Sequence, residues 1–389
     1  MATTEQRIPA KRFAPLNPPR RLLYGPGPTM VEPRVYEAMS KPLVGHLDPY
    51  FFEVLRDVQE LLRNAFGIKQ GFTIAISGTG TAGMEASVAN LIEPGMKFGI
   101  FANGYFCDRI SEMGTRHGAK VVRFEKPWGE VFSDSEAADF IRRERPNVVA
   151  YVHAETSTGA LQQGDAICAA AHEVGALVIA DVVTSLGAMP VNFDQTGIDV
   201  AYSCSQKGLS CPPGLSPIAV SQRAMDYMNS RKTPCRSWYL DLKLLYDYHT
   251  VSHRYHHTAP ISMFYALREA LVVIAEEGLE NRWERHRQCH HDFIEAVERM
   301  GLQMHVPDDK HRIWNLSTVR IPEGVDSVRV CKRLLDEKGI EILGGFGPLA
   351  GKVFRIGIMG PLATDRNVAL LLTEFENMLR SEGYKPRKG

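Results

Sequence analysis

Short apolar runs alternate with helical stretches between residues 72 and 221. The apolar runs have the length of strands and are Phe72–Ser77, Phe98–Ala102, Lys120–Phe124, Asn147–His153, Leu177–Ala180, Val200–Ser203 and Pro217–Val220. The helical stretches between them are Ala82–Leu91, Tyr105–His117, Ser135–Arg145 and Ala166–Val174. This alternation predicts an α/β fold with a mainly parallel sheet covered by helices on both faces. Strands that are apolar throughout agree with it, because both faces of such a sheet are buried.

The pattern changes after residue 260. A long helix is predicted over Ile261–Glu277, with apolar side chains on one face, and a charged helix follows from Leu279 to Met300. The remaining predicted elements are a strand at Asn315–Ile321, a helix at Ser327–Lys338, a strand at Val353–Ile358 and a helix at Thr364–Ser381. We therefore expect an N-terminal arm (1–22), a large domain (23–280) and a smaller C-terminal α+β domain (281–389).

Composition narrows the class of protein. The chain has 389 residues, which is long for one simple core, and 44% hydrophobic with 23% charged residues is ordinary for a globular protein. Lys+Arg and Asp+Glu both number 45, so no net charge favours nucleic acid or an anionic membrane as a partner. No apolar run reaches the roughly 18–20 residues that span a bilayer.

Cysteine usage and the N-terminal arm bear on the compartment. Seven cysteines, an odd number without a C-x-x-C pair, indicate a reducing compartment, and we expect a cytoplasmic protein. The basic arm leaves organelle targeting as the alternative. His286 and His290 lie one helical turn apart, but no acid or cysteine completes a metal site, so we expect no metal.

Ligands of open parallel sheets bind outside the carboxyl ends of the strands. The segments that follow the predicted strands are therefore the candidates for a site. They contain a glycine turn, an aromatic residue, a hydroxyl cluster, an acid and a lysine, at 78–81, 103–106, 155–158, 181–184 and 205–207.

The glycine turn Gly78–Gly83 matches G-x-G-x-x-G between a strand and a helix. A dinucleotide site also needs an acid at the end of the second strand, where this chain has Ala102 and Asn103. One phosphate monoester fits better, because a helix N-terminus favours an anion and Thr79 and Thr81 add hydroxyl donors. The alternative is a tight turn in which glycine serves only the geometry.

Three charged residues each allow more than one interpretation. Asp181 can cap a following helix, bind Mg²⁺, or pair with a protonated pyridine nitrogen, although no P-loop accompanies it for the second role. Lys207 is either a solvated surface charge or a partly desolvated, imine-forming lysine. Arg355 lies opposite Phe354 on its strand and faces either solvent or a substrate carboxylate.

Several stretches in order resemble one family. The chain is similar to class V, fold-type-I pyridoxal-phosphate aminotransferases, above all the alanine–glyoxylate and serine–pyruvate group, from about Leu23 to the C-terminal helix. The stretches that carry the resemblance are Gly25-Pro26-Gly27-Pro28, Ser77-Gly78-Thr79-Gly80, Ala102-Asn103-Gly104, Ser205-Gln206-Lys207 with Pro212-Pro213-Gly214, Tyr255-His256-His257-Thr258, Gly278-Leu279-Glu280-Asn281, and Gly344-Gly345-Phe346-Gly347-Pro348 before Arg355.

The resemblance implies a role for each matching residue. Lys207 would carry pyridoxal 5'-phosphate as a Schiff base and shuttle the proton, and Asp181 would pair with the pyridine nitrogen. Arg355 would clamp the substrate carboxylate beside Gly27. The other cofactor contacts would be Thr79, Gly80, Thr81 and Gln206 at the phosphate, Thr156 at the ring oxygen, Val183 and Phe106 on the ring faces, and Tyr255 and Thr258 from the other subunit of a homodimer.

The implied activity is transamination between an amino acid and a 2-oxo acid by a ping-pong mechanism. Alanine or serine would donate to glyoxylate, giving pyruvate or hydroxypyruvate and glycine. Phe106 stands where this group commonly has tryptophan, and Thr81 where some members have histidine, which loosens the substrate assignment. The alternatives are other donors (aspartate, ureidoglycine, 3-hydroxykynurenine, aminoethylphosphonate), a cysteine desulfurase-type lyase, and a catalytically silent binding protein of the same fold.

Overall fold

A computed structural model describes residues 13–385. The basic residues of the predicted arm lie partly in residues 1–12, so the prediction of a solvated or targeting arm falls outside the described residues. Within the described part, no helix combines the length and the apolarity that crossing a lipid bilayer requires.

The predicted sheet forms and has seven strands. Its strands in spatial order are β2 (Phe72–Ser77), β10 (Leu215–Val220), β9 (Val200–Tyr202), β8 (Leu177–Asp181), β5 (Val148–Val152), β3 (Lys97–Ala102) and β4 (Lys120–Glu125). The strand β10 runs antiparallel to β2 and β9, and the other neighbours pair in parallel. The expectation of a mainly parallel sheet is therefore confirmed.

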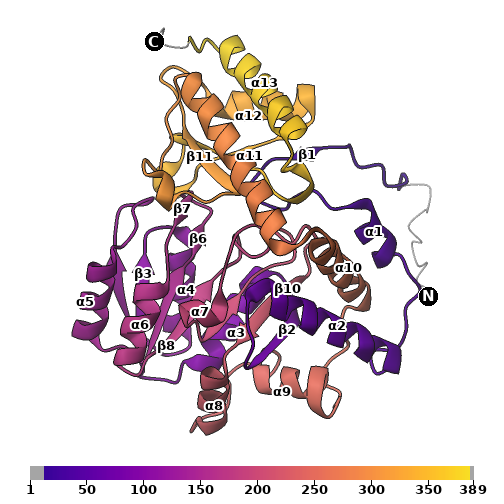
Figure 1. Cartoon of the computed structure of the whole chain (residues 1–389), viewed down its shortest axis with the longest axis vertical. Helices are drawn as coiled ribbons and strands as arrows, with labels where there is room; N and C mark the ends of the chain where they lie inside the picture. Colours follow the sequence, from indigo (N-terminus) through magenta and orange to yellow (C-terminus); the bar gives the residue numbers. More distant parts are fainter. Residues whose placement is uncertain (1–12, 386–389) are drawn as a thin grey trace, which may run out of the picture.

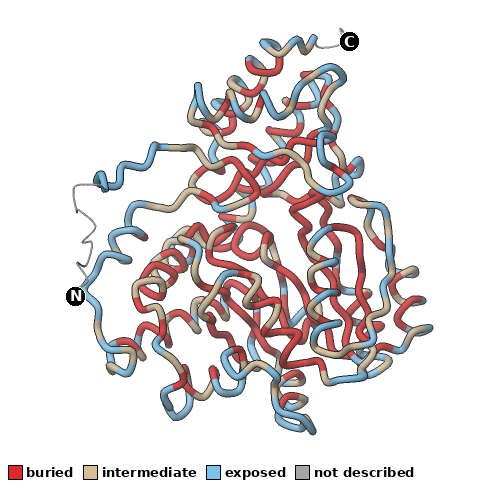
Figure 2. Tube along the Cα trace, turned by 180° about the vertical axis from the view of Figure 1, so that it is seen from behind, coloured by how far each residue is buried: buried red, intermediate tan, exposed pale blue. Residues whose placement is uncertain are grey.

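Each strand supplies side chains to two hydrophobic layers, one on each face of the sheet. On β8, Val178 and Ala180 join one buried cluster, whereas Leu177 and Ile179 join the other. The first layer is covered by α2 (Pro49–Phe66), α5 (Asp134–Glu144), α6 (Asp165–Glu173) and α10 (Ile261–Glu277). The second is covered by α3 (Gly80–Leu91), α4 (Tyr105–Arg116), α8 (Gln222–Ser230) and α9 (Leu242–Tyr246). Figure 2 shows the buried trace concentrated between these layers.

Local signals set the helix ends. Ser133 and Glu136 form a reciprocal capping box at the start of α5. The helix α2 begins after Asp48, whose side chain accepts a hydrogen bond from the Tyr50 amide, and ends at Gly67 in the left-handed region (φ 74°). The sequence predictions named no element in 24–71 or 221–260. The structure places α2, α8 and α9 there, together with α1 (Pro33–Met39) and a π-helix (Asp247–Val251).

The C-terminal elements lie above the large sheet in Figure 1. They are α11 (Leu279–Arg299), β11 (Leu316–Arg320), α12 (Ser327–Lys338), β12 (Ile340–Glu341), β13 (Leu343–Gly344), β14 (Val353–Gly357) and α13 (Asp365–Ser381). A third buried cluster joins Tyr24 to side chains between Cys289 and Leu379. The short β1 (Leu22–Leu23) pairs in parallel with β12, so the first strand of the described chain packs with the C-terminal elements. A domain boundary near residue 280 stays a prediction.

Short elements complete the fold. The two-residue strands β6 (Ala154–Glu155) and β7 (Ala160–Leu161) form a hairpin that carries hydroxyl residues just beyond β5. The remaining pieces are the helix α7 (Phe193–Thr196) and the 3-10 turns Asp309–His311, Gly347–Leu349 and Gly360–Leu362.

Candidate active site

Lys207 lies in the turn that follows β9, at the carboxyl edge of the sheet. Its side chain is only 8% exposed, and its Nζ donates to Thr184 Oγ1 (3.2 Å) and Thr156 Oγ1 (3.4 Å). Burial lowers the pKa of the Lys207 ammonium from its usual value, because removal from water disfavours the charged form. The alternative of a solvated surface lysine is therefore wrong.

Asp181 ends β8, the neighbouring strand, and is buried. One carboxylate oxygen accepts the Val183 amide (2.9 Å), and the other accepts the Tyr202 hydroxyl (2.7 Å). Burial raises the pKa of Asp181, and these two hydrogen bonds oppose that rise by stabilising the carboxylate. Turns follow Asp181 and the next helix begins at Phe193, so the helix-cap interpretation is wrong.

The glycine turn lies at the start of α3, with Thr79 as the residue before the helix. A Cβ at Gly80 would stand 3.2 Å from Val183 Cγ2, so the turn approaches the Asp181 segment as closely as a glycine permits. The Thr81 hydroxyl accepts a hydrogen bond from Arg109 Nη1 (3.0 Å). Within residues 13–385, Gln206 Oε1 is buried without a hydrogen-bond partner. First-turn amides and hydroxyls are donors that suit a phosphate, whereas the Gln206 oxygen is an acceptor and does not itself bind one.

An aromatic ring lies close to Lys207. The ring centroid of Phe106 lies 5.6 Å from Lys207 Nζ. Its backbone amide donates to Glu155 (3.0 Å), a fully buried carboxylate that also accepts the Ser157 amide (2.9 Å) and hydroxyl (2.6 Å). Burial raises the pKa of Glu155, with these hydrogen bonds opposing the rise. A Cβ at Gly104 would stand 2.3 Å from Glu155 Cγ, so the glycine admits the acid.

Arg355 lies on β14, where every residue is buried. Its Nε donates to the Gly344 carbonyl (2.9 Å), and its guanidinium carbon lies 4.6 Å from the centroid of the Phe346 ring. Burial lowers the pKa of Arg355 to about 10, opposed by the charge of Glu155. The solvent-facing alternative is therefore wrong, and among residues 13–385 Arg355 makes no ion pair. A buried cation without a counter-ion favours an anionic ligand.

The structure brings most of the predicted residues together, with two exceptions. Gly27 lies against Lys207, since a Cβ there would stand 3.1 Å from Lys207 Cγ, and its φ of +118° favours glycine. Tyr255 and Thr258 are exposed, and in the described chain no hydrogen bond or ring contact links them to Lys207 or the glycine turn. Their neighbour His257 does contact the end of β2, with its Nε2 2.7 Å from Ser77 Oγ.

Three residues of this region had no predicted role: Arg109, Glu155 and Tyr202. Arg109 follows Phe106 by one helical turn, and that spacing places it on the same face. Glu155 was included in a strand-end segment without a function. Tyr202 pairs in register with Asp181 on the adjacent strand, so only the order of the strands in the sheet reveals it.

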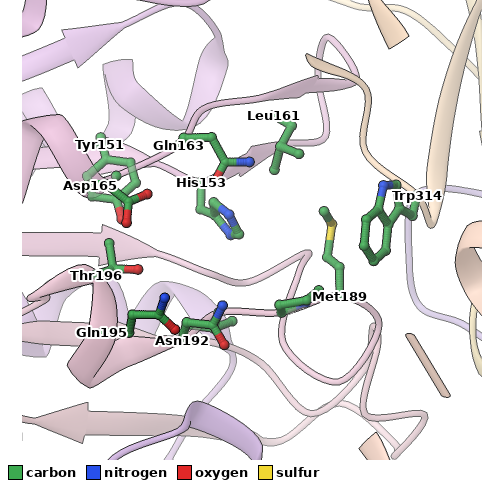
Figure 3. A pocket seen from close by; sticks show the side chains of 13 residues that line it. Tyr151, His153, Leu161, Gln163, Asp165, Met189, Asn192, Gln195, Thr196 and Trp314 are labelled. Carbon is green, nitrogen blue, oxygen red and sulfur yellow. The ribbon is translucent and has the colours of Figure 1, made fainter. Parts of the chain in front are cut away.

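A cavity of about 220 Å³ lies beside this cluster, between the end of β5 and Trp314 (Figure 3). His153 lines it and bonds through Nδ1 to Ser185 Oγ (2.8 Å), next to the Thr184 that contacts Lys207. Its lining includes Asp165 but no lysine or arginine. It therefore lacks the cation that an amino acid or oxo acid needs for its carboxylate, and the candidate site is the Lys207–Arg355 region.

Comparison with known proteins places this geometry in a family. The model of the class-V aminotransferases matches residues 22–354. The chain is 37% identical to an alanine–glyoxylate aminotransferase of Oryctolagus cuniculus, with 94% of each chain covered. It is 38% identical to an (S)-ureidoglycine–glyoxylate transaminase of Bacillus subtilis, covering 93% of this chain and 91% of that one. The crystal structure of an alanine–glyoxylate aminotransferase from Nostoc sp. superposes with a TM-score of 0.93 at 47% identity, covering 95% and 99%.

The chain belongs to the class-V aminotransferases. The fold-type-I architecture and the transaminase activity predicted for it are confirmed. The family implies a pyridoxal-phosphate cofactor, which the donors around Gly80 and Gln206 suit. A cysteine desulfurase from Thermococcus onnurineus shares only the fold (15% identity, TM-score 0.74). This aminotransferase has no cysteine in the loop 344–352, and its Cys331 lies in α12.

Proposed function

We propose that this aminotransferase transfers the amino group of alanine or serine to glyoxylate, with pyridoxal 5'-phosphate bound at Lys207. The observation that supports it is one buried lysine whose pKa is lowered, with the buried carboxylate of Asp181 on the adjacent strand and the unpaired Arg355 beyond. Products are pyruvate or hydroxypyruvate and glycine, formed in two half-reactions.

Lys207 bonds the cofactor and moves the proton. Burial favours its neutral amine, which is the form that attacks a carbonyl and accepts a proton from the substrate α-carbon. The hydroxyls of Thr156 and Thr184 orient Nζ without adding charge. Pyridoxal phosphate, when bound, supplies an electron sink for the charge left on the α-carbon.

Asp181 sets the electronic state of that sink. Its carboxylate, fixed by Val183 and Tyr202, stabilises a protonated ring nitrogen. The turn at Thr79, Gly80 and Thr81, together with Gln206, would hold the phosphate. Val183 and Phe106 would pack against the ring.

Arg355 binds the substrate carboxylate. Nε donates to the Gly344 carbonyl, and within residues 13–385 the two terminal nitrogens have no hydrogen-bond partner, so their N–H groups can make a bidentate contact. Gly27 leaves room for the substrate beside Lys207.

A homodimer and a cytoplasmic location are part of the proposal. Exposed Tyr255 and Thr258, without contacts to their own site, support a role at the phosphate of a partner subunit. The seven cysteines are free, which supports a reducing compartment.

A second donor has support from the comparisons. The B. subtilis relative is named for (S)-ureidoglycine, and the solved ureidoglycine–glyoxylate aminotransferase of that organism has a TM-score of 0.94 at 38% identity. Ureidoglycine is therefore the alternative donor, with glyoxylate again the acceptor.

The visible absorption spectrum tests the proposal. The purified enzyme should show a cofactor band that bleaches with L-alanine or L-serine and returns with glyoxylate. Lys207→Ala should lower turnover by at least about a thousandfold, in line with lost acid–base catalysis. Lys120→Ala, an exposed lysine on β4, is the matched control and should retain activity.

Each contrary outcome has a distinct meaning. A band that responds only to ureidoglycine refutes the alanine or serine donor and keeps the enzyme class. A protein that gains no band when pyridoxal phosphate is added refutes the cofactor. Substantial turnover by Lys207→Ala refutes the role of that lysine.

A further inference from the structure

A row of aromatic rings connects the two charged ends of the site. Phe106 lies 5.6 Å from Lys207 Nζ, and the ring of Tyr105 meets Phe106 edge-on at 5.6 Å. Tyr105 then meets Phe346 edge-on at 4.9 Å, and Phe346 lies 4.6 Å from the Arg355 guanidinium carbon. We call Tyr105, Phe106 and Phe346 the aromatic wall.

The wall is braced from outside by Trp128. Phe346 packs edge-on against Trp128 at 6.1 Å. At Gly347, with φ +55°, a Cβ would stand 3.0 Å from Trp128 Cη2, so the loop approaches the indole as closely as glycine allows. His305 Nε2 lies 2.9 Å from the Trp128 carbonyl and holds that segment in turn. A ring fixed by neighbours on two sides has little freedom to retreat from a ligand.

We propose that Phe346 and Tyr105 determine specificity and restrict this enzyme to substrates with short side chains. The inference rests on the proposed function, which puts the substrate's amino group at Lys207 and its carboxylate at Arg355. A substrate that spans those two residues lies alongside the wall. Each added methylene then meets Phe346, which packs against Trp128, or Tyr105, which packs edge-on against Phe346.

Arg109 is the cation next to the wall, with its guanidinium carbon 5.3 Å from the Tyr105 centroid and 5.1 Å from that of Phe106. It is engaged by the Thr81 hydroxyl at the phosphate turn. The second carboxylate of aspartate or 2-oxoglutarate adds length that would bring it against the wall, so size disfavours dicarboxylic substrates. The bulkier ureido group of ureidoglycine is disfavoured by size.

Phe346 affects both the binding of the substrate carboxylate and the size of the side chain that the site accepts. Its ring covers one face of Arg355, a cation–π contact whose loss should weaken carboxylate binding about two- to thirtyfold. The same loss widens the space beside the substrate. A pocket that rejects one extra methylene discriminates by about 10- to 200-fold, and an open pocket loses that preference.

The test compares donors that differ by one methylene. L-Alanine, L-2-aminobutyrate and L-norvaline are mixed with the wild-type holoenzyme, F346L, F346A and Y105A, and bleaching of the cofactor band gives kcat/KM for the half-reaction. L370A, an exposed side chain on α13, is the truncation control. Equal cofactor bands before mixing show that each variant is folded and loaded.

In the wild type, alanine should exceed 2-aminobutyrate by about tenfold or more, and aspartate should react far more slowly than alanine. F346A should reduce the preference for alanine at least about fivefold and raise KM for every donor. F346L should give values between those of the wild type and F346A, and L370A should match the wild type. An unchanged preference in both F346A and Y105A overturns the proposal, as does a wild type that prefers aspartate. A wild-type band indifferent to alanine and serine is a different result, because it refutes the proposed donor.

Discussion

The hydroxyl of Tyr202 is predicted to control the ionisation of Asp181. Tyr202 is fully buried, and its hydroxyl donates to the Asp181 carboxylate at 2.7 Å. Tyr202→Phe removes that donor and leaves the ring packed in place. A hydrogen bond to a charged group contributes about 1.5–3 kcal/mol, and one pKa unit corresponds to about 1.4 kcal/mol. The pKa of Asp181 should therefore rise further, by about one to two units.

The direction of this pKa shift follows from the form of Asp181 that the Tyr202 hydrogen bond favours. The Tyr202 hydroxyl stabilises the ionised carboxylate, so its loss costs stability where Asp181 is charged, and the cost fades as the pH falls through the raised pKa. The acid limb of the kcat/KM profile should move up by about one to two pH units. Cofactor dissociation, followed by absorbance, should become faster at neutral pH.

Tyr248→Phe is the matched control. Tyr248 is also fully buried, and its hydroxyl donates to the neutral carbonyl of His46 at 2.9 Å. It should lose about 1 kcal/mol of unfolding free energy with no change in the acid limb. Superimposable pH profiles for Tyr202→Phe and Tyr248→Phe would refute the role of Tyr202 at Asp181.

Three further predictions follow from local geometry. Gly27→Ala should lower kcat at least about tenfold at unchanged cofactor content, because the added Cβ lies 3.1 Å from Lys207 Cγ; an activity equal to wild type would refute this. Glu155→Gln should lower the urea-unfolding free energy by about 1–3 kcal/mol, since an amide cannot accept from the Phe106 and Ser157 amides together. His286, whose pKa burial lowers to about 3, stabilises the fold above pH 6.5 and loses that contribution as the pH falls. His286→Asn should therefore flatten the fall in stability between pH 6.5 and 4 by up to about 1.4 kcal/mol per pH unit, and an unchanged slope contradicts it.

The location of the site was predictable because parallel strands end at a common edge. Asp181 stands at the end of β8, and Lys207 follows the neighbouring strand β9. Predicting the strands correctly was therefore enough to bring the two residues together. The hydroxyls of Thr156 and Thr184 follow from the same rule. The exposed Tyr255 needed the family resemblance, since no contact in its own chain ties it to Lys207.

Other parts depended on tertiary contacts that local pattern does not encode. Alternation put Arg355 opposite Phe354, but burial of both faces of β14 came from the packing around it. No helix is predicted over Pro49–Phe66, although Asp48 and Pro49 form a standard start signal for α2. Tyr202 lies in a predicted strand, but the contact of its hydroxyl with Asp181 depends on the register between β8 and β9, which the local pattern does not encode.

Four buried titratable groups share this site without forming an ion pair among themselves in the described chain. Asp181 and Glu155 are held by amide and hydroxyl donors, while Lys207 and Arg355 are held by hydroxyl and carbonyl oxygens. Direct pairing would neutralise them at little net gain, because desolvation offsets the attraction. Neutral hydrogen-bond partners instead leave each group available to a ligand while fixing its position. Asp181 can therefore interact with a ring nitrogen, and Arg355 with a carboxylate. Binding of these ligands then restores the stability that ion pairs within the protein would have provided.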